Sequence, residues 1–383
     1  MQAGSARNMS DRAIVREARR SHARKCSILL AVLAVLFFAS LPMGGTAAVF
    51  HSFGEVADAL LLWVRVSFDG TVNHIQYSTK DILDQCPAYF QVLSRLAITG
   101  IAIACGAMTA LSGALYQMVF RNPIAAPTML GVGNGVTLGV VALVLVFEGA
   151  APFLTGFRYL FCYAGATIVL ALVIGLALLI GKGRLVVVDM LLVGSVVSAL
   201  AGQAIIFVTY CIFDEDAWDV FTAINEMLTV NTEPISLIVL AVALIVSIAP
   251  IALLRFKLNV VAFDEADMRL SGINPTALRG IALACATVMI ISAQTHIGTI
   301  AIIALIAPYA ARTWFGAEFS KQFWGAILIG AILVLACTDL SDFIGILLIN
   351  NGIVLSFPVG LAANLICLPV FAWIMASQNR AWE

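Results

Sequence analysis

Long apolar runs dominate the chain, and short polar segments separate them. A run of about 20 apolar residues is long enough to cross a bilayer as a helix. Because hydrocarbon offers backbone groups no water to bond, membrane-crossing segments form helices or closed barrels. Barrel strands would alternate apolar and polar residues over about ten positions, whereas these runs are continuous. The pattern predicts an all-α, polytopic membrane protein.

Ten runs are predicted to span the membrane, and the division between the seventh and eighth is the least distinct. They lie at about 26–50, 95–119, 127–147, 157–181, 188–213, 234–256, 279–296, 299–315, 323–345 and 358–377. We therefore expect a transmembrane domain over 26–378, after a basic tail at 1–25. Two long polar segments interrupt it, one at 51–94 with room for a short amphipathic helix and one at 257–278.

Composition supports lipid as the solvent of this chain. Of its 383 residues, 62% are apolar and 11% charged, and the mean hydropathy is +1.02, whereas a soluble domain is nearer half apolar and a quarter charged.

The eight cysteines form no CxxC pair and the four histidines are scattered, so we expect no metal or redox site. The tail and first run resemble a signal peptide, but the run exceeds the usual apolar length; cleavage after SLPMGGTAA stays an alternative.

The distribution of charge orients the predicted spans. With the amino terminus inside, 17 of the 21 Lys and Arg residues fall on the cytoplasmic side. The basic residues left outside are Arg65, Lys80, Arg95 and Arg158, while the outer segments hold 14 of the 22 acids. Positive charge is retained on the cytoplasmic side of membrane proteins. The asymmetry therefore indicates ten spans with both termini in the cytoplasm.

Motifs for catalysis or nucleotide binding are missing from the sequence. There is no GxxxxGK[ST] segment, so we expect no ATP hydrolysis by this chain through a P-loop. Ser292 and His296, four residues apart, would share a helix face, which leaves an intramembrane enzyme as one alternative. An ion-coupled secondary transporter is another, although Asp339 and Asp342 fall toward the outer end of the ninth span rather than at the midplane.

The segment FRNPIAAPTMLGVGNG (120–135) interrupts the apolar pattern between the second and third spans. Arg121, Asn122 and Pro123 are expected to form a tight cytoplasmic turn, because proline stops a helix and restricts the residue before it. Gly131 and Gly135 fall in the predicted third span, where small residues allow close helix packing. Their spacing does not match GxGxxG, which argues against a dinucleotide loop.

The cytoplasmic segment KLNVVAFDEADMRLSGINPTAL (257–278) contains a short helix signal. FDEADMRL carries acids at its start and good helix formers after them, and Ser271-Gly272 follows. This helix either caps the bundle or forms a docking surface for a cytoplasmic partner.

Several blocks, in the same order, resemble one known family. They are GALYQMVFRNPIAAPTMLGVGNG (113–135), DMLLVGSVVSAL (189–200), SGIN (271–274), GTIAIIALIAPYAAR (298–312), Asp339-Leu340 and FPVG (357–360). These are similar to the FecCD-type permeases of ABC importers for iron siderophores, haem and cobalamin, over roughly residues 90–378. The resemblance implies a type II ABC importer permease fold in a bacterial cytoplasmic membrane, surrounded by lipid and without nucleic-acid contacts.

The resemblance also implies partners and site residues. A second permease copy or paralogue would complete the path, two ATPase subunits would use the ATP, and this chain would bind no cofactor or metal. The ATPases would dock on a coupling loop, carried here by Asp264, Glu265, Asp267, Arg269, Ser271, Gly272 and Asn274. An extracytoplasmic substrate-binding protein would dock at Arg95, where the family pattern RLPR reads RLAI. Since the second arginine is missing, Arg65 and Lys80 are candidate replacements.

Overall fold

The computed structural model describes residues 2–43, 51–72, 77–147, 151–182, 187–213, 232–262, 265–352 and 357–379. The predicted all-α class is confirmed. The helices are α1 Gln2–Ser40, α2 Phe53–Val72, α3 Thr79–Gln85, α4 Tyr89–Val119, α5 Val132–Phe147, α6 Ala151–Ile180, α7 Val187–Phe213, α9 Pro234–Leu258, α10 Glu265–Leu270, α11 Pro275–Ile297, α12 Ala301–Phe315, α13 Phe319–Asn350 and α14 Val359–Asn379. Short 3-10 turns lie at η1 Pro127–Leu130 and η3 Asn259–Ala262.

The apolar helices lie where the ten spans were predicted. Within the described residues, seven helices are long and apolar enough to cross a membrane, and three shorter apolar helices lie at Val132–Phe147, Ala301–Phe315 and Val359–Ala372. Several helices extend beyond the predicted limits, such as α4, which begins at Tyr89, and α13, which ends at Asn350, and two others fall short of a predicted limit. α1 ends at Ser40 rather than near 50, since Leu41 precedes Pro42 and is restricted by it. The third span becomes helical only from Val132, after the 3-10 turn that begins at Pro127.

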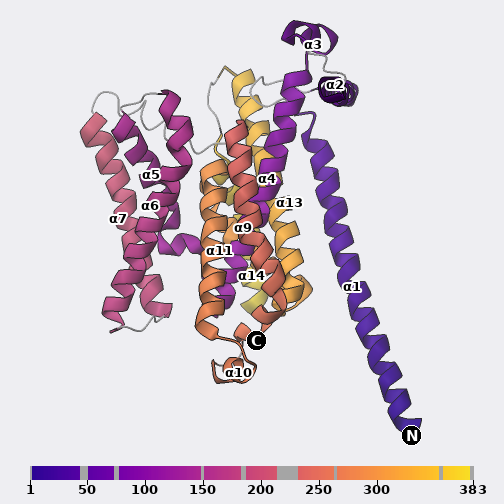
Figure 1. Ribbon diagram of the computed structural model, residues 1–383, viewed down its shortest axis with the longest axis vertical. Coiled ribbons are helices and arrows are strands. Elements are labelled where there is room, and N and C mark those ends of the chain that lie inside the picture. Colours follow the sequence, from indigo (N-terminus) through magenta and orange to yellow (C-terminus); the bar gives the residue numbers. More distant parts are fainter. Residues whose placement is uncertain are drawn as a thin grey trace.

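The helices form two groups (Figure 1). α5, α6 and α7 pack on one another, and α4 packs against α11, α12 and α13 in the other group. α4 is the most enclosed long span, and its glycines allow this. A Cβ at Gly106 would overlap the backbone of Gly330 on α13, and one at Gly113 would overlap Ala304 on α12. Small residues at these crossings bring the helix backbones close together.

α12 does not cross the bilayer thickness by itself. Its 15 residues rise about 22 Å, against a hydrocarbon core of about 30 Å. The break at Gly298–Ile300 that separates it from α11 contacts α14, because a Cβ at Gly360 would lie 2.5 Å from the Thr299 carbonyl oxygen. Non-helical backbone at membrane depth is tolerated where protein covers it.

The two ends of the bundle differ. α10 lies at one end, together with the amino-terminal end of α1, and α2 and α3 lie at the opposite end (Figure 1). We refer to these as the α10 end and the α2 end. The segment 51–94, which was predicted to have room for a short amphipathic helix, contains α2 and α3. A hydrophobic cluster around Tyr89 and Val92 joins these two helices to α4.

Candidate functional site

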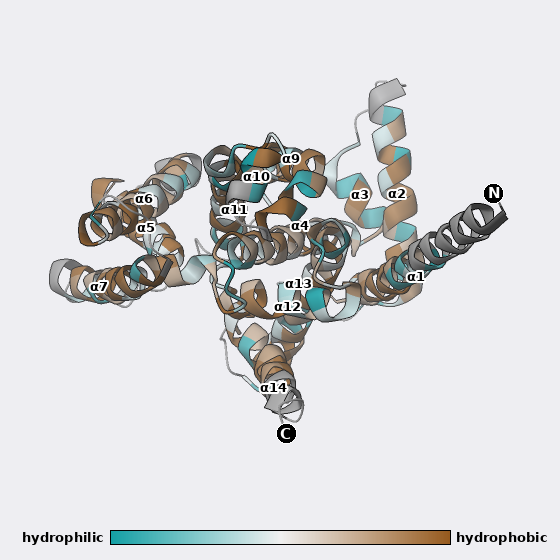
Figure 2. Ribbon diagram, turned by 90° about the horizontal axis from the view of Figure 1, so that it is seen from below, coloured by the Kyte–Doolittle hydropathy of each residue, from teal (hydrophilic) through white to brown (hydrophobic). Residues whose placement is uncertain are grey.

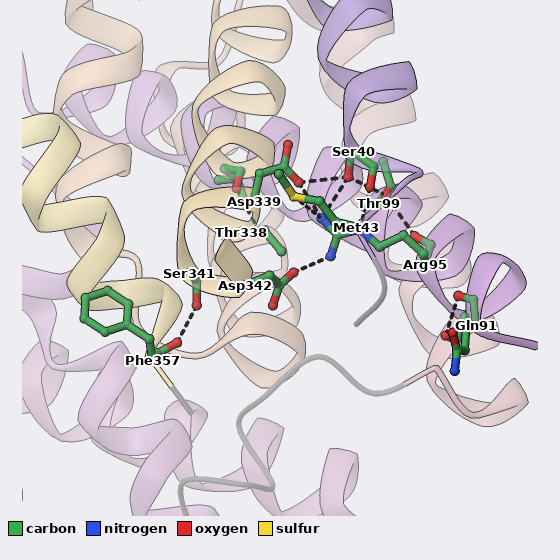
Figure 3. Close-up of polar contacts among 12 residues, drawn as sticks. Ser40, Met43, Gln91, Arg95, Thr99, Thr338, Asp339, Ser341, Asp342 and Phe357 are labelled. Carbon is green, nitrogen blue, oxygen red and sulfur yellow. Dashed lines mark hydrogen bonds and ion pairs between the residues drawn. The ribbon is translucent and has the colours of Figure 1, made fainter. Parts of the chain in front are cut away.

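A buried cluster of charged and hydroxyl side chains joins α1, α4 and α13 at the α2 end. Its members, here called the Arg95 cluster, are Ser40, Arg95, Thr99, Asp339 and Asp342 (Figure 3). Arg95 donates to Asp339 Oδ1 at 2.5 Å and to Asp342 Oδ2. It also donates to the Ser40 carbonyl at 3.0 Å and to Ser40 Oγ at 2.9 Å. The guanidinium is thus bound on all sides by this chain.

Hydroxyl groups complete the Arg95 cluster. Ser40 Oγ lies 2.8 Å from Asp339 Oδ1 and donates to it, and Thr99 Oγ1 lies 3.1 Å from Ser40 Oγ. The Arg95 side chain is fully buried, whereas Asp342 keeps 31% of its side chain exposed. Because a buried charge is costly unless it is paired and hydrogen-bonded, this arrangement fixes the end of α1 against the two central helices.

The docking of a binding protein at Arg95 stays a prediction, and the surroundings of this side chain count against it. Its side chain is enclosed and its donors already meet two carboxylates and Ser40. Two features of the sequence could have indicated this pairing. Asp339 and Asp342 lie three residues apart on an apolar helix, so they share a face, and Arg95 is predicted at the same end of the bundle.

The segment 257–278, the predicted coupling loop, contains the predicted short helix, α10, which ends in a Schellman motif. Ile273 N–H donates to the Met268 carbonyl at 3.0 Å and Gly272 N–H to that of Arg269 at 3.0 Å. Gly272 has a φ of +73°, which glycine adopts without a Cβ penalty at this position. Met268 is fully buried and anchors the helix. Its neighbour Leu270 is 87% exposed.

Asn274 links this motif to the next long helix. Its Oδ1 accepts from the backbone N–H of Thr276 at 3.1 Å and of Ala277 at 3.2 Å, so it caps the amino terminus of α11. An open depression of about 530 Å³ lies beside the cap, lined by Arg269, Gly272, Ile273, Asn274, Pro275 and Thr276. Of the other coupling-loop residues, Asp267 and Ser271 are exposed. Asp264 and the Glu265 side chain lie outside the described residues.

The Arg-Asn-Pro turn lies against the start of the coupling loop. Arg121 has a φ of +50° and donates to the Val261 carbonyl on η3 at 3.2 Å. Asn122 Oδ1 accepts from the Ile124 N–H at 3.0 Å, which is an Asx turn across Pro123. The turn at 121–123 and the segment 257–278 are therefore in contact at the α10 end.

The two glycines singled out after this turn have different surroundings. Gly131 lies before α5 rather than within it, and its φ of +75° ends the 3-10 turn. Gly135 lies in α5, where an added Cβ would approach the Ala166 Cα on α6 to 2.6 Å. Gly135 thus permits the close contact of α5 with α6, whereas Gly131 adopts the left-handed conformation that ends the 3-10 turn.

Ser292 and His296 do not form a serine–histidine pair. His296 Nδ1 lies 2.7 Å from the Ser292 backbone carbonyl, and Nε2 lies 3.0 Å from the Ser236 carbonyl. The Ser292 hydroxyl donates to the Val288 carbonyl at 2.7 Å and contacts Tyr163. Since the imidazole does not bond the hydroxyl, it is not placed to activate it as a base. Across the part of the chain described here, no three His, Cys, Asp or Glu residues group as metal ligands.

A polar junction at the α10 end joins η3 to the start of α13. Glu318 Oε2 pairs with Lys321 at 2.5 Å, and its Oε1 accepts from Ser320 Oγ at 2.7 Å. Asn259 Oδ1 accepts from the Ser320 N–H at 2.9 Å. The hydrogen bond from Lys321, followed by that from Ser320, lowers the pKa of the Glu318 carboxyl below its ordinary value. The contacts hold Glu318 in its charged form.

Comparison with known proteins finds relatives of this chain by sequence. A probable iron chelatin transport system permease of Helicobacter pylori is 28% identical over 282 residues, covering 73% of this chain and 80% of the relative. The hemin transport system permease of Yersinia pestis is 27% identical, covering 75% and 83%. The vitamin B12 import system permease of Citrobacter koseri is 28% identical, covering 75% and 82%.

A solved structure supports the fold. An inward-facing conformation of a metal-chelate type ABC transporter matches with a TM-score of 0.68 and 20% identity, covering 93% of this chain and 99% of that chain. The sequence model of the FecCD transport family matches residues 61–377. The chain is a multi-pass membrane protein that belongs to the FecCD transport family.

Proposed function

We propose that this chain is the permease subunit of an ATP-driven importer for an iron chelate, either a siderophore complex or haem, or for a corrinoid. The family match over residues 61–377 carries the proposal. Three relatives are described as permeases for an iron chelatin, hemin and vitamin B12. All three cargoes are large metal chelates, and two of them contain iron, so an iron chelate is the favoured substrate.

The proposed assembly is a dimer of permeases, with a second copy or a paralogue completing the path. It lies in a bacterial cytoplasmic membrane with both termini in the cytoplasm, so the α10 end faces the cytoplasm. Two ATPase subunits bind and hydrolyse ATP and drive alternating access, and this chain binds no cofactor itself. The exposed side chains of Asp267, Arg269 and Leu270 around the Schellman motif support α10 as the ATPase docking surface.

A substrate-binding protein would deliver the chelate at the α2 end. Because Arg95 is enclosed within the Arg95 cluster, docking there requires other basic groups. Arg65 on α2 and Lys80 on α3 are exposed at this end, and we propose that they take part.

An ion-coupled secondary transporter is the alternative function. It would need a carboxylate inside the membrane that binds and releases a cation during transport. Asp339 and Asp342 are the acids on α13, and both are already paired with Arg95. This pairing favours the ATP-driven importer.

Reconstitution tests the proposal. The chain is purified with its ATPase and placed in proteoliposomes containing ATP, and uptake of a ferric siderophore, haem or cobalamin is measured with the binding protein added outside. We expect uptake that requires ATP and that stops when the ATPase is replaced by a variant unable to hydrolyse it. Uptake driven by a proton or sodium gradient without the ATPase would overturn the proposal.

A further inference from the structure

α2 lies across the bundle rather than along it. Figure 1 looks nearly along its axis, whereas Figure 2, turned by 90°, shows its full length while the long helices are seen end-on. α2 is therefore roughly perpendicular to the bundle axis. A helix in this orientation cannot be a membrane span, although its 20 residues are sufficient in number for one.

Hydrogen bonds fix α2 at the level where α1 ends. His51, just before α2, donates from its backbone to the Pro42 carbonyl at 2.8 Å and from Nε2 to Gln91 Oε1 on α4 at 2.5 Å. At the other end of α2, Tyr77 donates to Asp69 Oδ2 at 2.6 Å. The helix is thus held at both ends, to α4 at one and to the segment before α3 at the other.

The level of α2 corresponds to the edge of the hydrocarbon layer. The candidate membrane span of α1, Arg20–Ser40, has 21 residues, which rise about 31 Å, close to the thickness of about 30 Å of the hydrocarbon core. α1 therefore leaves the hydrocarbon near Ser40. Leu41, the next residue, packs in the same cluster as Val56 and Ala59 of α2.

α2 has apolar residues on two opposite faces. Val56, Ala59 and Leu62 are buried against Leu41, Tyr89 and their neighbours. On the other side, four large apolar residues are 58–70% exposed and share one face at helical spacing, namely Phe53, Leu61, Val64 and Phe68. Asp58, Arg65 and Asp69 form a narrow polar strip between these faces, as the 100° step of the helix places them. The first face belongs to the protein interior, and the second has no partner in the described part of the chain.

We propose that this second face of α2 is a membrane-interface surface, which lies in the headgroup and acyl boundary of the leaflet at the α2 end. Helices with an apolar face and a polar strip lie in the interface plane in this way. The surface is next to a lipid-facing one, since Val35 and Phe38 near the end of α1 are also exposed. The polar strip can remain in water while the apolar face contacts lipid. The proposal does not depend on the ATP-driven function or on the cargo.

Photo-crosslinking of the full chain in phospholipid nanodiscs tests the proposal. The photoreactive residue p-benzoylphenylalanine replaces Phe68 or Leu61 on the exposed apolar face, and Asp58 on the polar strip as the matched control. All three positions are exposed, so the substitutions leave the buried contacts of α2 intact. After illumination, intact-protein mass spectrometry measures the fraction of chain that has gained the mass of one phospholipid.

We expect phospholipid adducts at positions 68 and 61, at about fivefold or more over position 58, because the apolar face alone contacts acyl chains. Equal adduct yields at all three positions would overturn the proposal. Crosslinks from 68 and 61 to a second copy of the chain, with no lipid adduct, would also overturn it. So would the lack of any adduct at 68 and 61.

Discussion

The guanidinium of Arg95 and the carboxylate of Asp339 lie 2.5 Å apart, although 244 positions separate them in the sequence. The pair joins α4 to α13 in the part of the bundle that also receives the end of α1. Because the Arg95 side chain is fully buried, the pair is a structural element within this chain.

Replacing Arg95 is expected to destabilise the bundle strongly. Arg95→Ala leaves Asp339 and Asp342 without their common cation, and removal of one partner of a buried ion pair costs about 3–5 kcal/mol. Thermal unfolding in detergent should show a lower transition temperature, or the variant should fail to accumulate. The matched control is Arg65→Ala, because the Arg65 side chain is 70% exposed beside Asp69, and exposed pairs contribute about 0.2–1 kcal/mol. Equal stability of the two variants would contradict the role of the cluster.

Gly272→Ala is expected to lower ATP-driven uptake without unfolding the bundle. An added Cβ would meet nothing within 4 Å, so the cost comes from the φ of +73°, roughly 1–2 kcal/mol for an alanine. The strain changes the end of α10 and so the proposed docking surface. Uptake in proteoliposomes and thermal unfolding are measured together. Gly280→Ala on α11 is the control, since its Cβ also meets nothing and its backbone is helical; unchanged uptake in Gly272→Ala would place docking elsewhere.

Gly135→Ala is expected to separate α5 from α6. The added Cβ would lie 2.6 Å from the Ala166 Cα, and because that atom belongs to the backbone it cannot move alone. Overpacking of this kind costs about 1–3 kcal/mol, which should appear as a lower unfolding temperature in detergent. Gly175→Ala on α6 is the comparison, because nothing lies within 4 Å of its Cβ. If both variants unfold at the same temperature, the close contact does not contribute to stability.

Glu318→Gln is expected to reduce stability at neutral pH and to have no effect in acid. The Lys321 and Ser320 hydrogen bonds lower the pKa of Glu318 in the folded chain. Because the pKa of Glu318 is lower in the folded chain than in the unfolded chain, its charged form stabilises the folded state at pH values above the ordinary pKa. This stabilisation is lost as the pH falls through the pKa of the folded chain. The Glu318 side chain is 43% exposed, so the effect is small, at most about 1 kcal/mol. The difference between the unfolding temperatures of the two chains is followed from about pH 7 down to about pH 2, and it should shrink as the pH falls. A difference that persists in acid would contradict this assignment.

The spans could be predicted from the sequence because hydrocarbon imposes one requirement on every membrane helix. A run of apolar residues near 20 long is recognisable whatever its neighbours are, so the seven long and three shorter apolar helices among the described residues lie where the pattern placed them. The end of α10 was also predictable, because Gly272 and Asn274 act on backbone groups within a few residues of themselves.

Contacts between distant segments could not be predicted in this way. Positive charge near one end of a span indicates its orientation, and it placed Arg95 at the correct end of the bundle. The charge pattern did not show whether the Arg95 side chain faces water or two carboxylates on another helix. The packing of α1, α4 and α13 decides between these two environments.

The sequence by itself determined the helical membrane architecture, the number of apolar runs and the chemistry of the turns. These follow from local spacing and from the cost of unpaired backbone in lipid. Only the tertiary structure decided that Arg95 is enclosed by Asp339, Asp342 and Ser40, that Arg121 contacts Val261, and that α2 lies across the bundle. These relationships depend on packing between segments far apart in the chain, and no local pattern encodes which helix faces will meet.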